Sequence, residues 1–216
     1  MDPLDYKESI TKIYLVRHGE TLANKKGLIF GQLDLDLNST GVKQATKAAH
    51  ELFIKAGVRA GLKPAPTRCI DYILTSPLKR AKHTASIIAK KLRVKDIIIE
   101  KNLIEKSEGS WDGKSYWEIR EKDPKNYSKW VQNPFKSKAP KGESIYDLNK
   151  RVKQFHQTIL KKYLGKNIII VSHSGPIRLF ILNLLGANIN KFWNLQIGCG
   201  GVVEISLSRK HSVIKI

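Results

Sequence analysis

Residues 13–21 read IYLVRHGET, a run of four apolar residues that leads directly into an arginine, a histidine and a glycine. The run Ile13–Val16 has the length and composition of a buried β-strand. In open α/β sheets, ligands bind beyond the carboxyl ends of the strands. Arg17 and His18 therefore stand where such a sheet would place its chemistry, and Gly19 lets the backbone turn there.

A second apolar run ends in a histidine in the same way. Residues 168–171 read IIIV and are followed by Ser172 and His173. Between the two runs, the short apolar segment at residues 72–74 leads toward Arg80. If these three segments are parallel neighbours, the rim of the sheet carries four basic side chains: Arg17, His18, Arg80 and His173. Arginine forks match phosphoryl oxygens two at a time, so this rim predicts a site for a dianionic phosphoryl group.

Hydrophobic periodicity predicts alternating strands and helices along the rest of the chain. Strands are expected at residues 12–17, 71–75 and 97–99, at 167–172, and in a terminal hairpin at 201–206 and 211–215. Helices are expected from a cap at 38–40 to about 55, from Pro77 in the first turn to about 91, and at 116–122, 144–163 and 176–185. Residues 57–68, which contain two prolines, are predicted to be a loop. Strands separated by helices favour a parallel sheet covered on both faces.

Five motifs follow one another between about Lys12 and about Leu185. They are LVRHGET (residues 15–21), FGQLDLDL (30–37), SPLKRA (76–81), LIE (103–105) and VSH (171–173). Together they resemble the motifs of the histidine phosphatase superfamily, also called the phosphoglycerate mutase-like family. The resemblance implies an α/β three-layer sandwich, with a mostly parallel central sheet and helices on both faces. No linker divides the chain, so one domain over residues 1–216 is expected.

The resemblance also implies the roles of individual residues. His18 is the expected nucleophile, which would carry the phosphoryl group as a phosphohistidine. Glu105 is the expected proton donor, although its position alone does not separate it from Glu108 or Asp112. His173 is the third expected catalytic residue. The expected phosphate-binding residues are Arg17, Arg80, His173 and Ser174, and the expected substrate-binding residues are Asn24 and Gln32.

The chemistry sets two further expectations for these residues. Attack on phosphorus requires a neutral imidazole, and a backbone carbonyl that accepts from Nδ1–H of His18 would present its Nε2 to the substrate. Negative charge on the phosphoryl oxygens would be held by Arg17, Arg80 and a protonated or donating His173. Ser174 and Gly175 precede Pro176 at a predicted helix start, where backbone amides attract an anion.

These features predict a phosphomonoesterase that hydrolyses a small phosphorylated metabolite. The alternative within the family is a cofactor-dependent phosphoglycerate mutase. Mutases carry Glu-Arg-His-Tyr-Gly in the acid segment, whereas residues 105–109 here read EKSEG. PKGES at residues 140–144 is also similar to an element of the phosphatases, but Lys106 and Lys114 keep the mutase open as substitutes for the missing residues. A third hypothesis, an inactive protein that binds through its basic surface, is disfavoured because all the expected catalytic residues are present.

The net charge of this chain bears on which partners it is expected to bind. Its 216 residues include 39 Lys and Arg against 19 Asp and Glu, a formal net charge of +20. A positive surface attracts anions, including nucleic acid. However, no basic run carries interleaved aromatic residues and no nucleic-acid-binding motif is present, so nucleic acid is not an expected partner. The expected partner is the small phosphorylated substrate, and the sequence leaves a homodimer open.

The expected location and cofactors follow from sequence features that are absent from this chain. No apolar run approaches the roughly 18 residues of a membrane span, and residues 1–6 do not resemble a signal peptide. Cys69 and Cys199 form no CxxC pair, so a reducing cytoplasm is expected. No cofactor and no metal are expected, since the histidines lack ligand spacing and the nearby arginines would repel a cation.

Overall fold

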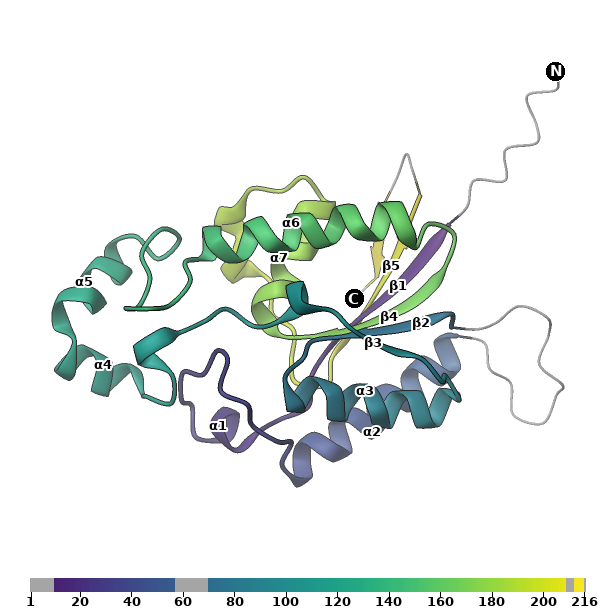
Figure 1. The fold of residues 1–216 in the computed structure, drawn as a ribbon, viewed down its shortest axis with the longest axis horizontal. Coiled ribbons are helices and arrows are strands. Elements are labelled where there is room, and N and C mark those ends of the chain that lie inside the picture. The colour runs from purple at the N-terminus through teal and green to yellow at the C-terminus, as the bar shows by residue number, and fades with distance from the viewer. Residues whose placement is uncertain (1–9, 57–69, 209–211, 216) are drawn as a thin grey trace, which may run out of the picture.

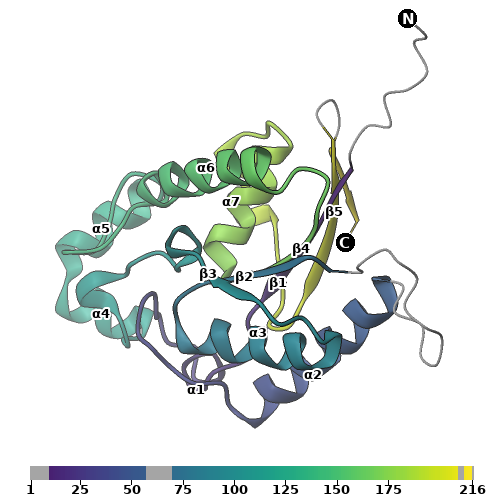
Figure 2. The same cartoon turned by 45° about the vertical axis from the view of Figure 1, so that its right-hand side comes forward.

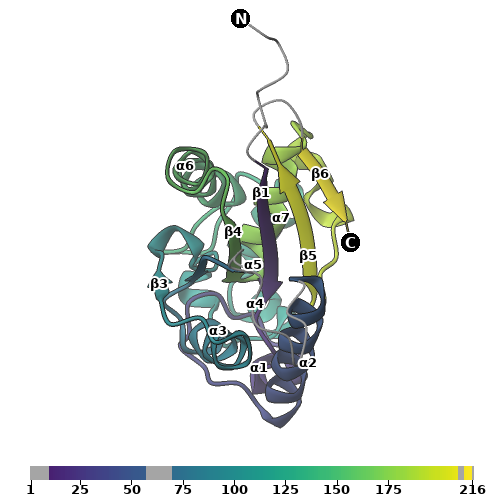
Figure 3. The same cartoon turned by 90° about the vertical axis from the view of Figure 1, so that its right-hand side faces the viewer.

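The computed structural model describes residues 10–56, 70–208 and 212–215. These residues form a six-stranded sheet in the order β3-β2-β4-β1-β5-β6 (Figure 1). The strands are β1 (Thr11–Arg17), β2 (Tyr72–Thr75), β3 (Ile97–Ile99), β4 (Asn167–Ser172), β5 (Val202–Leu207) and β6 (Ser212–Lys215). Strands β1 to β4 are mutually parallel, whereas β5 runs antiparallel to β1 and β6 antiparallel to β5. Figure 3 shows β5 and β6 at the edge of the sheet beside β1.

Helices cover both faces of this sheet, as expected (Figures 1 and 2). The helices are α1 (Leu22–Lys25), α2 (Ser39–Lys55), α3 (Lys79–Leu92), α4 (Tyr116–Lys122), α5 (Pro124–Gln132), α6 (Ile145–Lys162) and α7 (Ser174–Leu184). Short 3₁₀ helices are η1 (Lys101–Leu103), η2 (Gly109–Trp111) and η3 (Ile189–Asn194).

The alternation of side chains along β1 explains the two layers. Ile13 and Leu15 pack into the apolar core under α6 and α7, whereas Tyr14 and Val16 pack into the core over α2 and α3. Successive residues of a strand point to opposite faces, so a strand that is apolar at every position must be buried on both. All four residues are at most 1% exposed.

The strand register brings the ends of three strands together. In the pairing of β1 with β4, Arg17 lies opposite Ser172, so His18 and His173 follow at the same level. On the other side of β4, Thr75 pairs with Val171. The chain therefore leaves three neighbouring parallel strands at one rim, where ligands of α/β sheets bind.

A small subsidiary core lies beyond the sheet, where α4 and α5 extend away from it (Figure 1). Trp111, Ile119 and Ala139 are buried there, and Trp130 packs edge-on against Trp111. The indole nitrogen of Trp111 donates to a carboxylate oxygen of Asp123 at 3.0 Å. This cluster packs α4 and α5 against the segment after Glu105, because large aromatic rings bury much apolar area.

Most predicted elements are confirmed, including the terminal hairpin, and two details were wrong. Pro77 was expected in the first turn of a helix, but α3 begins at Lys79 with Leu78 as its N-cap. Helix α7 begins at Ser174 and not at Pro176, so Ser174 and Gly175 form its first turn. The helix predicted at residues 116–122 is confirmed as α4, and the helix that follows it, α5, was not predicted; Pro124 occupies the first turn of α5.

Some expectations lie outside the described residues: the loop at 57–68, Cys69 and the N-terminal residues 1–6. Among the helices of the described ranges, none combines the length and the apolar character that crossing a bilayer requires.

Candidate active site

His18 begins the turn after β1 and is only 2% exposed. Its backbone amide donates to the carbonyl of Ser172 at 3.0 Å, which fixes the residue against β4. Its Nδ1 lies 2.7 Å from the carbonyl oxygen of Gly19. A carbonyl can only accept, so Nδ1 carries the proton and Nε2 is the basic nitrogen. Burial, the charge of Arg80 and, more weakly, that of Arg17 lower the pKa of His18 to about 3, so its imidazole is neutral at pH 7.

His173 is the N-cap of α7 and is fully buried. Its ring centroid lies 5.0 Å from that of His18, so the two histidines meet as the sequence predicted. Its Nε2 lies 2.7 Å from the hydroxyl of Ser76, and its Nδ1 accepts from Arg80 at 3.3 Å. Burial first, then the charges of Arg80 and His18, hold the pKa of His173 well below its usual value. Of the two expected forms, the structure favours the neutral one, with Nε2–H as the donor.

Arg80 joins the two histidines. It lies in the first turn of α3, and its side chain is fully buried. Its Nε is 3.3 Å from Nε2 of His18 and 3.3 Å from Nδ1 of His173. Its terminal nitrogens donate to the carbonyls of Leu33 and Gly31, both at 2.7 Å. Burial lowers the pKa of Arg80 to about 10, against the opposing effect of Glu105, so the guanidinium stays charged at pH 7.

Two further guanidinium groups lie near this centre. Arg17 donates to the carbonyl of Ile197 at 2.7 Å, while its Nε is buried and meets no hydrogen-bond partner among the described residues. Arg178 follows Ser174 by one turn of α7, and its Nε is likewise buried without a partner in the described ranges. The pKa of Arg178 is lowered by burial and then by the charge of Arg17, and raised by Glu105. Its charge therefore acts within the same site.

The position of Arg178 near this centre was not predicted from the sequence. Its guanidinium carbon lies 5.2 Å from the ring centre of Phe192 and 5.7 Å from that of Trp193. Such contacts with aromatic faces orient the planar group and leave its edge available for an anion. The available signal was its spacing, because a residue four positions after Ser174 lies on the same helix face.

Glu105 lies two residues after η1, at the amino end of α7. Its carboxylate accepts the backbone amide of Lys106 at 2.8 Å and that of Gly175 at 3.3 Å. A Cβ on Gly175 would lie 2.5 Å from the carboxylate oxygen, so only glycine leaves room for this approach. The nearby Glu108 is instead paired with the amine of Lys106 at 2.5 Å, and Asp112 accepts the amide of Gly31. Glu105 is thus the carboxylate at the histidine rim.

The other predicted residues lie at different distances from this centre. The amide nitrogen of Gln32 donates to the backbone carbonyl of Glu105 at 3.0 Å, so Gln32 contacts the acid segment directly. The carboxamide oxygen of Asn24 accepts from the amide and hydroxyl of Thr21, both at 2.9 Å, and caps α1. Ser174 is partly buried at the start of α7, beside His173.

The arrangement suits an oxyanion. Two neutral histidines lie beside the guanidinium of Arg80, and the charges of Arg17 and Arg178 act nearby. A bound dianion would offset the repulsion between these guanidinium groups. Within the described part of the chain, no group of three or more His, Cys, Asp or Glu side chains is placed to hold a metal ion. Lys106 is one of the two lysines that kept the mutase alternative open as substitutes for the missing residues, and its amine contacts Glu108 and the carbonyl of Glu143.

Comparison with known proteins agrees with this geometry. Phosphoserine phosphatase 1 of Hydrogenobacter thermophilus is 33% identical over 205 residues, covering 95% of this chain and 90% of that protein. The metal-independent phosphoserine phosphatase of Arabidopsis thaliana is 36% identical over 183 residues, covering 84% of this chain and 72% of that protein. The crystal structure of the alpha-ribazole phosphatase of Shigella flexneri superposes with a TM-score of 0.82 at 29% identity and covers 95% of both chains.

This chain also matches the sequence pattern that is common to the members of one protein family. It is described as the histidine phosphatase superfamily (branch 1), and the match extends over residues 13–216. The motifs that carry the resemblance lie together at one rim of a mostly parallel sheet. This chain therefore belongs to the histidine phosphatase superfamily.

Proposed function

We propose that the protein hydrolyses a small phosphate monoester through a phosphohistidine on His18, with Glu105 as the proton donor. The observation that carries the proposal is the neutral imidazole of His18, whose basic Nε2 lies 3.3 Å from Nε of Arg80. A nucleophile must hold a free electron pair, and a buried cation beside it attracts the phosphoryl oxygens to the same point.

The reaction proceeds in two displacements. The lone pair of His18 Nε2 forms the N–P bond while the bond from phosphorus to the ester oxygen breaks. The departing oxygen takes a proton from the carboxylic acid of Glu105, and the alcohol leaves. Water then attacks phosphorus, the carboxylate of Glu105 accepts its proton, and the N–P bond breaks to return His18 and release phosphate. Arg17 and Arg80 hold the equatorial oxygens in both steps, and His173 joins them by taking up a proton on Nδ1 when the dianion binds. The first turn of α7, beginning at Ser174, lies beside them.

Hydrolysis of p-nitrophenyl phosphate tests this mechanism. We expect the His18→Asn variant to lose activity by at least roughly 1,000-fold, because covalent catalysis is removed. A matched control is His83→Asn, since His83 is exposed on α3 and should not matter. Brief incubation with substrate should leave an acid-labile, alkali-stable phosphoryl group on the wild type and none on His18→Asn. Full activity of His18→Asn would contradict the role of His18.

Arg178 supports a narrower substrate class. Its Nε has no hydrogen-bond partner among the described residues and its guanidinium contacts aromatic rings, which suits a second anionic group on the substrate. Phosphoserine, which carries a carboxylate, is the substrate named for two relatives. We expect phosphoserine to be preferred over phosphoethanolamine, which lacks that carboxylate. The variant Arg178→Met should lower kcat/KM for phosphoserine by roughly 10- to 100-fold, the value of a charged hydrogen bond, and leave phosphoethanolamine little changed. Equal losses for both would refute the second anion site.

The mutase alternative is tested in the same assays. Interconversion of 3- and 2-phosphoglycerate that is stimulated by a bisphosphate would favour it over hydrolysis, although Lys106 is already paired with Glu108.

Four further statements belong to the proposal: one domain over residues 1–216, a cytoplasmic location, no metal requirement and no nucleic-acid partner. The word metal-independent in the name of the Arabidopsis thaliana relative supports the third.

A further inference from the structure

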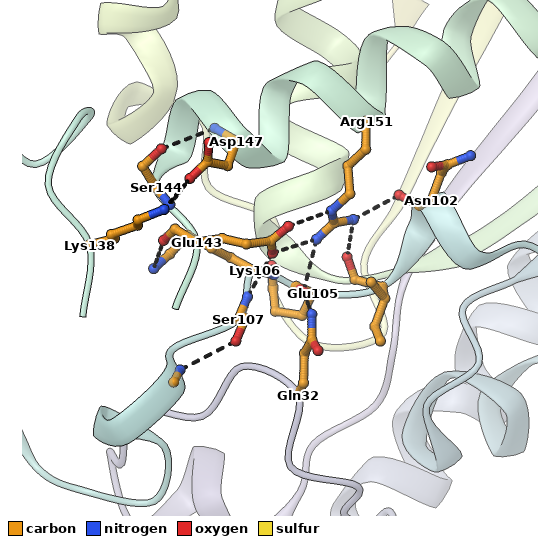
Figure 4. A network of polar contacts seen from close by, with 12 residues as sticks. Gln32, Asn102, Glu105, Lys106, Ser107, Lys138, Glu143, Ser144, Asp147 and Arg151 are labelled. Atoms are coloured by element: carbon orange, nitrogen blue, oxygen red, sulfur yellow. Dashed lines mark hydrogen bonds and ion pairs between the residues drawn. The ribbon is translucent and has the colours of Figure 1, made fainter. Parts of the chain in front are cut away.

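We infer that Arg151, through its pairing with Glu143, is a positioning residue for Glu105. This inference rests on the proposed function, in which Glu105 donates the proton. Arg151 lies on α6 and extends toward the segment that carries Glu105, as Figure 4 shows. Its side chain is 15% exposed, so it contacts this segment from within the protein.

The guanidinium of Arg151 uses every donor it has. One terminal nitrogen donates to the carbonyls of Asn102 at 2.8 Å and Ile104 at 2.6 Å. The other donates to the carbonyl of Glu105 at 2.9 Å and to the carboxylate of Glu143 at 3.1 Å. The Nε donates to the second carboxylate oxygen of Glu143 at 3.1 Å. An arginine has five N–H groups in a fixed plane, so these five bonds hold three carbonyls in one geometry (Figure 4).

Glu143 holds the other side of the same segment. Its carboxylate accepts the backbone amide of Ser107 at 2.8 Å, and its own amide donates to the carbonyl of Ser107 at 2.8 Å. Glu143 stands just before Ser144, the N-cap of α6. The chain is therefore tied to α6 both before and after Glu105. A second anchor comes from the sheet, where the hydroxyl of Ser172 donates to the carbonyl of Leu103 at 2.7 Å.

The carboxylate of Glu105 depends on this support. Its hydrogen bonds come from two backbone amides, those of Lys106 and Gly175. The bond to Gly175 is 3.3 Å long, so a small shift of the segment would lose it. The carbonyl of Glu105 is shared by Arg151 and by Gln32 of the loop after α1. A shift of about 1 Å in a reacting group can cost roughly 100-fold in rate.

Leaving-group dependence separates positioning from a general structural role. An alkoxide is strongly basic and must be protonated as it leaves, whereas p-nitrophenolate leaves without that help. Misplacing the proton donor therefore lowers kcat/KM for an alkyl phosphate far more than for p-nitrophenyl phosphate. A loosened fold would instead lower both values by the same factor. We compare kcat/KM because it reports the steps up to departure of the alcohol and not the later hydrolysis of the phosphohistidine.

The test measures the ratio of kcat/KM for p-nitrophenyl phosphate to that for β-glycerophosphate. We expect Arg151→Lys to raise this ratio at least ~10-fold, since a lysine cannot reproduce the planar fork. Glu143→Gln keeps the shape of the side chain and should raise the ratio in the same direction, which also tests the inference if Arg151→Lys folds poorly. Arg120→Lys is the matched control, because Arg120 is exposed on α4 and the ratio should not change.

Glu105→Gln distinguishes the two possible failures. If Glu105→Gln leaves the ratio unchanged, Glu105 is not the proton donor and the proposed mechanism is wrong. If Glu105→Gln raises the ratio but Arg151→Lys and Glu143→Gln do not, the mechanism stands and the inference about Arg151 is overturned. A raised ratio in all three variants, with Arg120→Lys unchanged, supports both.

Discussion

The low pKa of His18 predicts that this residue makes the protein less stable in acid. The pKa is about 3 in the folded chain against an ordinary value of 6.5, with burial as the main cause and the charge of Arg80 as the next. Between these two values the unfolded chain binds a proton that the folded chain refuses. The stabilisation is therefore fully present above pH 6.5 and is lost as the pH falls toward 3.

The size of this loss follows from the two pKa values. A pH of 5 is 1.5 units below the ordinary pKa of 6.5, so His18 is protonated in the unfolded chain at this pH, whereas it is still neutral in the folded chain. One unit corresponds to about 1.4 kcal/mol, so His18 should contribute a loss of about 2 kcal/mol between pH 7.5 and pH 5. The variant His18→Asn cannot take up this proton and should lack that part of the pH dependence.

Other groups must be separated from His18 in this comparison. The pKa of His173 is also lowered, first by burial and then by Arg80, and both causes remain in His18→Asn. Its contribution is therefore largely common to the two proteins and cancels in their difference. Phosphate and sulfate must be left out of the buffers, because an anion that binds only the folded chain adds stability.

Urea unfolding at pH 7.5 and pH 5 measures the effect. We expect the free energy of unfolding of the wild type to fall by about 2 kcal/mol more than that of His18→Asn. His50→Asn serves as the control and should behave as the wild type, since His50 is exposed on α2. Equal pH dependence in the wild type and His18→Asn would refute the argument that His18 is buried in its neutral form.

Three further predictions follow from single contacts. Gly175→Ala should lower kcat/KM for alkyl phosphates at least ~10-fold with the fold retained by circular dichroism, because the new Cβ would lie 2.5 Å from an oxygen of Glu105. Ser144→Ala should lower the free energy of unfolding by about 1 kcal/mol in urea, since its hydroxyl accepts the amide of Asp147 at 3.0 Å and caps α6. Incubation with EDTA should leave phosphatase activity unchanged, because the described residues offer no cluster of three metal ligands and the proposed chemistry uses histidine and arginine.

Where sequence prediction succeeded, the deciding interactions are local. The continuous apolar run at residues 168–171 can only be satisfied by burial on both faces, and β4 is indeed the strand between β2 and β1. A helix cap was predicted at residues 38–40, and Asn38 is that cap, because its side chain accepts the backbone amide three residues later. The helix predicted from about Ser144 begins at Ile145, directly after Ser144. Parallel pairing then placed the residues after β1 and β4 side by side.

Where it fell short, the deciding contacts join distant parts of the chain. The residues near Pro124 in the sequence do not predict that Trp130 of α5 packs against Trp111. The expectation for Asn24 could not include its cap on Thr21, because a single turn of helix has no periodicity to detect. The form of His173 depends on burial and on Arg80, which is 93 residues away in sequence.

The sequence by itself determined the family, the order of the layers and the pair of histidines, because strand burial and helix periodicity depend on residues that are close together in the sequence. Only the tertiary structure decided which nitrogen of His18 is basic, that Nε of Arg178 meets no partner among the described residues, and that Arg151 holds the segment of Glu105. The first and third of these features arise from backbone carbonyls, which every residue carries alike. Their partners are selected by how the helices pack against the sheet, and no residue type records that choice.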